Sequence, residues 1–211
     1  MKKIWKRFIT FEGPECSGKT TQITLLRDFL TKNNEDVIIT REPGGTKIGE
    51  QLRDIVKYHQ ASKMTAKTEL LLFAASRAQL VAEIIIPALE NGSYVICDRF
   101  IDSTVAYQGF ARHLDIEFIN QLNSFVTENC TPGLTFLLDL SVEEGLKRAN
   151  KRNQNRRSED RIEAESGDFH KAVRDGFLKL ADENKERITV INASVSEEEI
   201  HQKILEQLGF K

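Results

Sequence analysis

The sequence is poor in cysteine and carries almost no net charge. Its 211 residues include three cysteines, Cys16, Cys97 and Cys130, with no close pair among them. A disulfide framework needs more cysteines and a metal site needs tighter spacing, so we expect a reduced, cytoplasmic protein. The 30 Lys and Arg residues nearly balance the 32 Asp and Glu residues. The net charge of −2 argues against a protein whose main task is to coat nucleic acid, although it permits a local basic patch.

Long apolar runs are also missing. The longest strongly apolar run, residues 70–75, has six residues, whereas a membrane-spanning helix needs about 20. The basic N-terminus is followed by only four residues, 8–11, before Glu12, too few for the apolar part of a signal peptide. We therefore expect a soluble chain that binds no membrane. Hydrophobic residues at 40% and charged residues at 29% exclude a disordered or fibrous protein.

Short β-type runs alternate with longer helical patterns. The sequence predicts strands at residues 7–12, 37–40, 94–97, 134–140 and 188–191. It predicts helices at residues 19–30, 48–58, 66–89, 116–128, 141–151, 169–182 and 197–208. We expect Pro87 to kink or end the long helix at residues 66–89. The alternation predicts one α/β domain over residues 1–211, with a mostly parallel five-stranded sheet covered by helices on both faces.

A phosphate-binding motif follows the first predicted strand and opens the first predicted helix. Residues 13–20, GPECSGKT, fit the pattern G-x-x-x-x-G-K-[ST] in the context that it requires. Its glycines let backbone N–H groups surround phosphates, Lys19 supplies a positive charge, and Thr20 offers a hydroxyl to Mg²⁺. The alternative is a Gly-rich turn that only caps a helix. We predict that ATP phosphates bind these residues: Gly13, Pro14, Glu15, Cys16, Ser17, Gly18, Lys19 and Thr20.

Charged residues follow two other predicted strands at the same edge of the sheet. Arg41 begins a Pro-Gly-Gly loop after the second strand, and Asp98 and Arg99 follow the third. An acid at the end of an apolar strand beside a phosphate loop suits a Mg²⁺-bound water, so Asp98 joins Thr20 as a predicted metal residue. Arg99 is placed to contact phosphate while charge develops during transfer. The alternative for Asp98 and Arg99 is a local ion pair at a strand end.

The chain resembles the thymidylate kinases of the bacterial type over nearly its whole length. The resemblance rests on FEGPECSGKTTQ (residues 11–22), TREPGGT (40–46), LLFAASRAQL (71–80), DRFIDSTVAYQG (98–109) and DRIEAE (160–165). It implies a P-loop NTPase fold of the nucleoside monophosphate kinase kind and transfer of the γ-phosphoryl group from ATP to dTMP. The product would be dTDP, for dTTP biosynthesis, with Mg²⁺ as cofactor and a homodimer as the assembly.

Two other functions compete with this interpretation. One is a kinase for another nucleoside monophosphate, such as dUMP, UMP or dGMP. The other is a non-enzymatic P-loop regulator or nucleic-acid-binding protein that uses a basic segment at residues 147–161. A GTPase switch is disfavoured because the sequence contains neither N-K-x-D nor D-x-x-G.

The resemblance assigns the acceptor phosphate and sugar to particular residues. Arg41, Arg53 and Arg99 would hold the monophosphate, since each guanidinium can donate two hydrogen bonds to phosphate oxygens. Glu15, an odd choice inside an anion site, would bind the deoxyribose 3′-hydroxyl. Tyr107 would exclude a ribose 2′-hydroxyl.

The thymine base would be bound by four further residues. Phe73 would stack on the ring and Arg77 would hydrogen-bond to a thymine carbonyl. Their spacing alone favours a core Phe73 and an Arg77 that reaches out to water. Thr104 and Gln108, on an expected turn after Asp98, would contact the base edge; the alternative is that they are ordinary polar residues at a helix N-terminus.

The resemblance makes the basic segment a lid, at about residues 148–162, that closes over ATP. The alternatives are a solvated helix face or a nucleic-acid patch. Cys16 stands where some thymidylate kinases carry a phosphate-loop arginine, so the catalytic arginine is expected in the lid. We take Arg152 as that residue, with Arg156 as the second choice. The predicted catalytic residues are therefore Lys19, Arg99 and Arg152. The lid arginines are Arg148, Arg152, Arg156 and Arg157.

Overall fold

The computed structural model describes residues 3–58, 64–153 and 160–210, and a parallel sheet runs through that part of the chain. From one edge to the other, its strands are β2 (Val37–Arg41), β3 (Tyr94–Asp98), β1 (Lys3–Glu12), β4 (Cys130–Asp139) and β5 (Ile188–Asn192). Every neighbouring pair is parallel, which confirms the predicted α/β class and the five-stranded sheet. The strands β1 and β4 begin earlier than predicted, and their register shifts between Trp5 and Ile9.

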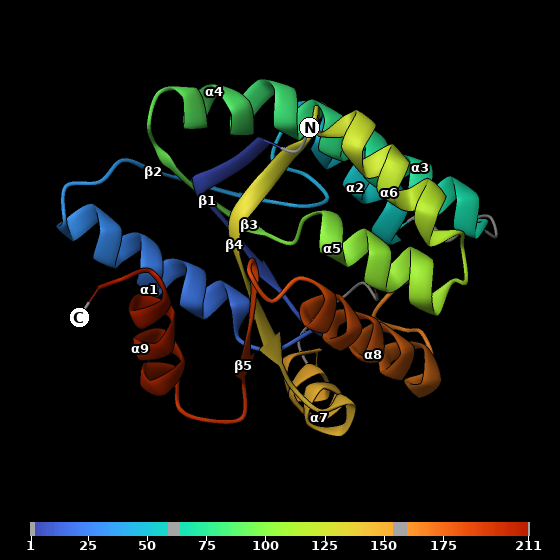
Figure 1. Ribbon diagram of the computed structural model, residues 1–211. Helices are drawn as coiled ribbons and strands as arrows, with labels where there is room; N and C mark the ends of the chain where they lie inside the picture. The colour runs from blue at the N-terminus through green and yellow to red at the C-terminus, as the bar shows by residue number, and fades with distance from the viewer. Residues whose placement is uncertain (1–2, 59–63, 154–159, 211) are drawn as a thin grey trace.

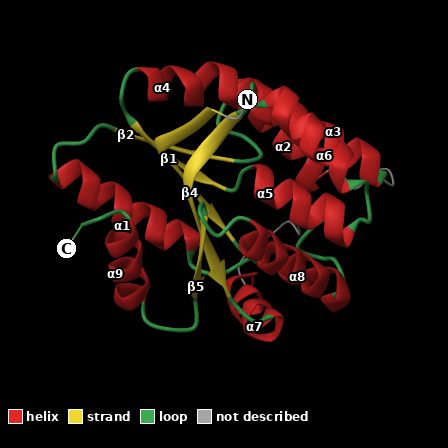
Figure 2. Cartoon of the chain, viewed as in Figure 1, coloured by secondary structure: helices red, strands yellow, loops and turns green. Residues whose placement is uncertain are grey.

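Helices cover both faces of the sheet (Figures 1 and 2). On one face, α1 (Lys19–Lys32) and α9 (Glu197–Gln207) lie side by side. The other face is covered by α3 (Ala66–Leu80), η1 (Val81–Ile85), α4 (Ile86–Glu90), α5 (Ile101–Thr104), η2 (Val105–Ala111), α6 (Ile116–Val126) and α8 (Gly167–Glu183). Of the remaining helices, α2 (Lys47–Tyr58) packs against α3 and α7 (Val142–Asn153) follows β4.

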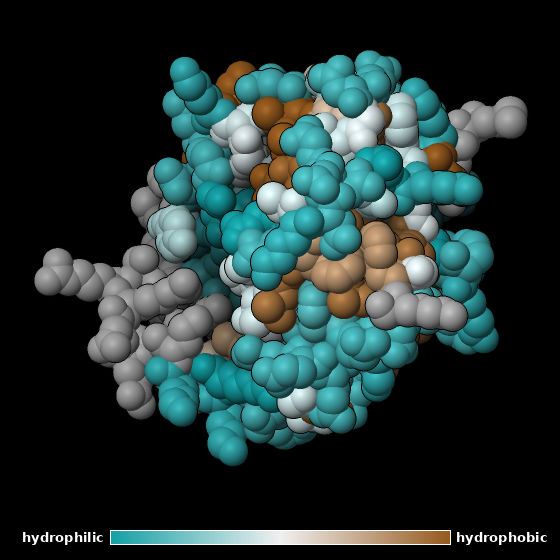
Figure 3. All heavy atoms as spheres, turned by 90° about the vertical axis from the view of Figure 1, so that its left-hand side faces the viewer, coloured by the Kyte–Doolittle hydropathy of each residue, from teal (hydrophilic) through white to brown (hydrophobic). Residues whose placement is uncertain are grey.

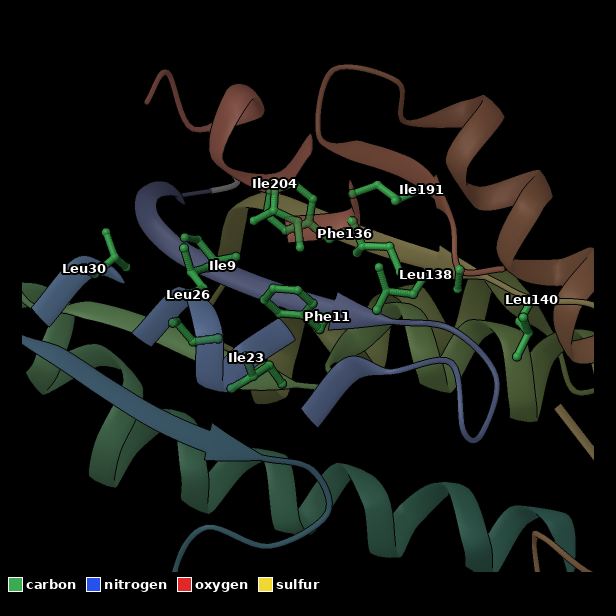
Figure 4. Packing of buried hydrophobic residues seen from close by; sticks show 13 residues of the cluster. Ile9, Phe11, Ile23, Leu26, Leu30, Phe136, Leu138, Leu140, Ile191 and Ile204 are labelled. Atoms are coloured by element: carbon green, nitrogen blue, oxygen red, sulfur yellow. The ribbon is translucent and has the colours of Figure 1, made fainter. Parts of the chain in front are cut away.

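A hydrophobic core between the sheet and the two helices α1 and α9 holds the central strand β1 in place (Figure 4). Phe11 of β1 packs against Phe136 of β4, with ring centroids 5.4 Å apart. Leu26 of α1 and Ile204 of α9 reach the same cluster and are fully buried. Burial of each such side chain stabilises the fold by about 1.5–3 kcal/mol. The outer side of this layer is mostly hydrophilic around a hydrophobic patch (Figure 3).

The helix that contains Pro87 continues past it to Glu90, so of the two predicted outcomes an end at Pro87 is wrong, and a kink stays a prediction. A π-helical segment, η1, precedes the proline, and the Ile86 N–H donates to the Val81 carbonyl five residues back. Proline lacks an N–H and crowds the preceding turn, and the wider π turn accommodates it. The helix ends at Glu90, just before Gly92 with a φ of 82°.

One helical stretch, Ala66–Glu90, is long and apolar enough by length and composition to cross a membrane. By length and composition, the expectation that no stretch could span a membrane is therefore wrong. Scattered polar residues interrupt the apolar run, but they do not lower the average hydropathy of the helix much. Core helices pass the same test. This stretch packs against α2 and α6 and buries the charged side chains of Glu69 and Arg77.

The segment after β3 is helical, as α5 and η2, where the sequence predicts a turn. The buried carboxylate of Glu12, at the end of β1, accepts hydrogen bonds from the backbone N–H groups of Phe100 and Ser103 at 2.8 and 3.2 Å. Glu12 thus satisfies donors at the helix start, a task that a neighbouring cap residue usually performs. This partner lies 88 residues away from Phe100 in the chain, so local sequence cannot reveal it.

Candidate active site

The carboxyl ends of the strands open into a cavity of about 860 Å³. Ligands of parallel α/β sheets bind at this edge. Most of the predicted site residues line the cavity: Glu15, Cys16, Ser17, Gly18, Lys19, Thr20, Arg41, Arg53, Phe73, Arg77, Asp98, Arg99, Thr104, Tyr107, Gln108 and Arg148. Gly13 and Pro14 belong to the same loop as Glu15 but do not line the cavity.

The loop between β1 and α1 is a tight turn built on glycines. Gly13 has a φ of 129° and Gly18 a φ of 93°, values that side chains rarely allow. A Cβ atom on Gly13 would lie 2.4 Å from the backbone oxygen of Leu138. The loop therefore packs directly on the neighbouring strand β4, and only glycine fits there.

Lys19 begins α1 and turns back over the loop. Its buried Nζ donates to the carbonyl oxygens of Gly13 and Pro14 at 3.2 and 2.8 Å. Burial and the nearby charge of Arg99 lower the pKa of Lys19. The ammonium group is thus held at the mouth of the loop, where a phosphate chain would receive its charge.

Gly13→Ala is expected to destabilise the protein more than Gly18→Ala. Both changes place a side chain at positive φ, but only at Gly13 does the new methyl group meet backbone; nothing lies within 4 Å of it at Gly18. We expect Gly13→Ala to lower the free energy of unfolding by about 2–4 kcal/mol and Gly18→Ala by about 1 kcal/mol. Urea denaturation measures both values. Equal losses would contradict the close packing of the loop on β4.

An ion pair joins the phosphate loop to the end of β3. The Nη2 atom of Arg99 lies 3.0 Å from Oε1 of Glu15, and its guanidinium lies 5.2 Å from the ring centre of Tyr107. Burial raises the pKa of Glu15, but the charges of Arg99 and Lys19 outweigh it and hold that pKa well below its ordinary value. Glu15 is therefore ionised at neutral pH and can accept a hydrogen bond from a ligand hydroxyl.

Asp98 and Thr20 are the predicted Mg²⁺ residues. The buried Oδ1 of Asp98 has no hydrogen-bond partner among the described residues, and Thr20 is exposed in the first turn of α1. Within the described ranges, no group of three or more His, Cys, Asp or Glu side chains could hold a metal. Mg²⁺ commonly keeps several waters and substrate phosphates and uses one or two protein groups, so the pair fits this ion.

Helix α3 and the α5–η2 helix line the part of the cavity away from α1. On α3, Glu69, Phe73 and Arg77 are spaced four residues apart and share one face. Arg77 Nη2 donates to Thr104 Oγ1 at 2.8 Å, and Gln108 Nε2 donates to Glu69 Oε1 at 2.7 Å. The half-buried Phe73 lies between these two pairs along α3. Thr104 and Gln108 thus come from the α5–η2 helix and not from the predicted turn.

Arg77 is 1% exposed, so the interpretation that it reaches out to water is wrong. Its guanidinium donates to both carboxylate oxygens of Glu42, at 2.6 to 3.1 Å, and to Asn123 Oδ1 at 2.8 Å. Burial raises the pKa of Glu42, and the charge of Arg77 opposes that effect. The groups that accept from Arg77 lie on α6 (Asn123) and in the loop after β2 (Glu42). The spacing of residues within α3 cannot reveal partners on other elements.

Arg41 and Arg53 line the cavity near the loop after β2. Both carboxylate oxygens of Glu50 accept hydrogen bonds from Arg41 Nη2 at 2.9 Å, and half of the Arg41 side chain is exposed. Arg53 Nη1 donates to the Pro43 carbonyl at 2.8 Å. The three arginines predicted to bind phosphate, Arg41, Arg53 and Arg99, thus line one cavity, which Arg77 and Arg148 also line.

The predicted lid is described only at its two ends. Arg148 on α7 lines the cavity and donates to Glu144 at 3.0 Å and to the Ala193 carbonyl at 3.4 Å. Arg152 belongs to α7, but its side chain lies outside the described structure. Arg156 and Arg157 lie outside the described residues altogether.

Several cavity residues carry no clear signal in the sequence. Gln22, Ala193, Val195 and Ser196 line the end of the cavity between α1 and α9. Gln22 looks like an ordinary polar helix residue, and the loop after β5 contains no charged or Gly-rich motif. Glu69 does not line the cavity but holds Gln108, which does, and only this three-dimensional contact distinguishes it from a surface acid.

Comparisons with known proteins agree with this geometry. A family model described as thymidylate kinase matches residues 11–204. A thymidylate kinase from Kosmotoga olearia is 46% identical over 200 residues, covering 95% of this chain and 94% of the relative. Another, from Halothermothrix orenii, is 49% identical and covers 93% of both chains. A crystal structure of thymidylate kinase from Ehrlichia chaffeensis shares 37% identity with a TM-score of 0.76, over 95% of this chain and 97% of that one.

Proposed function

Because the chain belongs to the thymidylate kinase family, we propose that it transfers the γ-phosphoryl group of ATP to dTMP, giving dTDP and ADP. The observation that carries the proposal is a single cavity with two different halves. One half is bordered by a phosphate loop, and the other by Phe73, by Arg77 with its partner Thr104, and by Gln108. A donor and an acceptor site that share one cavity are what a nucleoside monophosphate kinase needs.

ATP occupies the half next to α1. The backbone of residues 13–20 surrounds the β- and γ-phosphates at the helix N-terminus, and Lys19 supplies a positive charge. The adenine end reaches the lining formed by Gln22, Arg148 and Val195, which continues from the phosphate loop toward α9. Thr20 and, through a water, Asp98 would hold Mg²⁺, which would supply positive charge to neutralise the phosphate oxygens.

dTMP occupies the other half. Arg41, Arg53 and Arg99 hold its phosphate, and Phe73 stacks on the thymine. Arg77, Thr104 and Gln108 address the base edge from the buried side of the cavity. Glu15 accepts a hydrogen bond from the 3′-hydroxyl, and the buried Tyr107 fills the space that a 2′-hydroxyl would need.

In the transfer, an oxygen of the dTMP phosphate attacks the γ-phosphorus as the bond to the oxygen bridging the β- and γ-phosphates breaks. The attacking oxygen is already ionised at neutral pH, so no general base is required. Lys19, Arg99 and Arg152 of the lid stabilise the charge that develops on the γ-phosphoryl oxygens. Residues 148–162 close over ATP and exclude water, which suppresses hydrolysis.

The chain acts as a homodimer in the cytoplasm. The outward faces of α3 and α6 expose Leu71, Phe118 and Phe125, the last with 81% of its surface accessible, which supports an apolar contact between two copies. The buried Cys97 and Cys130 are free thiols, which suits a reducing compartment. Sedimentation of a monomer at micromolar concentration would contradict the dimer.

The experiment that tests the proposed function is an acceptor panel with ATP and Mg²⁺. We expect dTMP to give the highest kcat/KM for ADP formation, followed by dUMP, which lacks only the base methyl group. UMP is expected to be at least about 10-fold poorer, because the buried Tyr107 opposes its 2′-hydroxyl. Equal use of UMP and dTMP would contradict the role of Tyr107, and DNA binding without dTMP-dependent ATP consumption would support a nucleic-acid-binding protein.

A further inference from the structure

We propose that Glu69 is a positioning residue for pyrimidine recognition, which orients the side-chain amide of Gln108 so that its oxygen, not its nitrogen, faces the base. Nothing in the reaction itself requires this carboxylate. The inference rests on the assignment of Gln108 to the base-binding half of the cavity.

The carboxylate of Glu69 lies at the centre of a buried network and is 1% exposed. It accepts a hydrogen bond from Gln108 Nε2 at 2.7 Å. Two arginines hold it from other directions: Arg112, through Nε at 3.2 Å and Nη2 at 3.1 Å, and Arg161, through Nη2 at 2.6 Å. Gln108 is itself 2% exposed, so its amide has little freedom to find other partners.

The chemistry of this network determines the orientation of the amide. An ionised carboxylate only accepts hydrogen bonds, so the group that Gln108 directs at it must be the NH₂. Burial raises the pKa of Glu69, but the hydrogen bonds from Arg112, Gln108 and Arg161 outweigh it and keep that pKa below its ordinary value. Glu69 is therefore ionised at neutral pH, and the Gln108 oxygen is left for a ligand in the cavity.

A fixed acceptor distinguishes the pyrimidine bases. Thymine and uracil carry an N3–H donor between two carbonyl groups, which suits an amide oxygen. Cytosine carries an unprotonated N3, whose lone pair would face that oxygen. A site that keeps an acceptor here rejects cytosine because the buried oxygen is left without a donor.

The two arginines that hold Glu69 are themselves held by further contacts. Arg161 Nε donates to the Val56 carbonyl at 3.1 Å, and its backbone N–H donates to the Lys57 carbonyl at 3.1 Å. Arg112 also pairs with Glu165 at 2.6 Å. The carboxylate is thus fixed from the end of η2 and from the C-terminal end of the predicted lid, which is anchored on α2, and it does not turn with the Gln108 amide.

Glu69→Gln tests the proposal, because a neutral amide both donates and accepts and frees Gln108 to rotate. We expect the ratio of kcat/KM for dTMP to that for dCMP to fall at least about 10-fold, through a higher KM for dTMP and better use of dCMP. Glu165→Gln is the matched control: it removes another carboxylate from Arg112 without touching Gln108, and the ratio should not change.

A double variant shows whether Glu69 acts through Gln108. In a Gln108→Leu background, Glu69→Gln should cause no further loss of discrimination. Equal decreases of kcat/KM for both nucleotides, or an unchanged ratio, would reduce Glu69 to a structural role and overturn the inference. Failure of the wild-type protein to use dTMP would instead contradict the proposed function, so the two failures are distinguishable.

A measurement on the wild-type protein is independent of how well the variant folds. With ¹⁵N-labelled side-chain amides, the Gln108 NH₂ signal, assigned with Gln108→Leu, should stay hydrogen-bonded and protected from exchange before and after dTMP binds. Loss of that protection on dTMP binding would show that the base takes the NH₂ group and would overturn the proposal.

Discussion

Lys19→Ala is expected to lower kcat for dTMP phosphorylation at least about 10³-fold while the fold survives. The ammonium group lies over the phosphate loop, where it would stabilise the charge that develops on the transferring phosphoryl group. Its two hydrogen bonds go to loop carbonyls at the edge of the cavity. Their loss should lower the free energy of unfolding by only about 1–2 kcal/mol, so the variant stays folded. Steady-state kinetics and urea denaturation measure the two effects separately.

The matched control is Lys32→Ala, at the exposed last turn of the same helix. It removes the same charge from α1 without approaching the cavity, and we expect activity within about 2-fold of wild type. A near-normal rate for Lys19→Ala would refute the assignment of the phosphate loop.

Arg77→Met is expected to cause the largest loss of stability, about 3–5 kcal/mol. The variant would leave Glu42, which is 5% exposed, buried without the guanidinium that donates to both its oxygens. The free energy of unfolding from urea titration gives the value. Binding of dTMP should weaken as well, because Arg77 lines the acceptor half of the cavity.

A second variant separates stability from binding. Adding Glu42→Met to Arg77→Met removes both buried charges, so we expect most of the lost stability to return while dTMP binding stays weak. Isothermal titration of dTMP into both variants measures the binding. If Arg77→Met alone lowers the free energy of unfolding by less than about 1 kcal/mol, Arg77 and Glu42 do not form the buried ion pair described above.

The layout of the fold could be predicted because it depends on local patterns. Short β-type runs that alternate with helical periodicity define a parallel sheet, and the Gly13–Thr20 motif depends only on residues adjacent in the chain. The carboxyl ends of neighbouring strands lie at one edge, which is why Arg41, Asp98 and Arg99 meet the phosphate loop in one cavity.

The rest depends on partners that are distant in the chain. Arg77 looks like a residue that reaches water until Glu42 and Asn123 are placed beside it, 35 and 46 residues away. The helix after β3 needs Glu12 from another strand to satisfy its first donors. Glu69 gains its importance only from Gln108 and from arginines that α3 does not contain. Long-range polar contacts of this kind leave no periodic trace in a single sequence.

The most direct test of the central claim is a single-turnover reaction with ATP labelled at the γ-phosphate, Mg²⁺ and excess dTMP. If the cavity joins a donor and an acceptor site as proposed, the label should appear in dTDP with about one equivalent transferred per active site, and little should appear as inorganic phosphate. Label released mainly as inorganic phosphate, at a rate that dTMP does not change, would show an ATPase and would contradict the account.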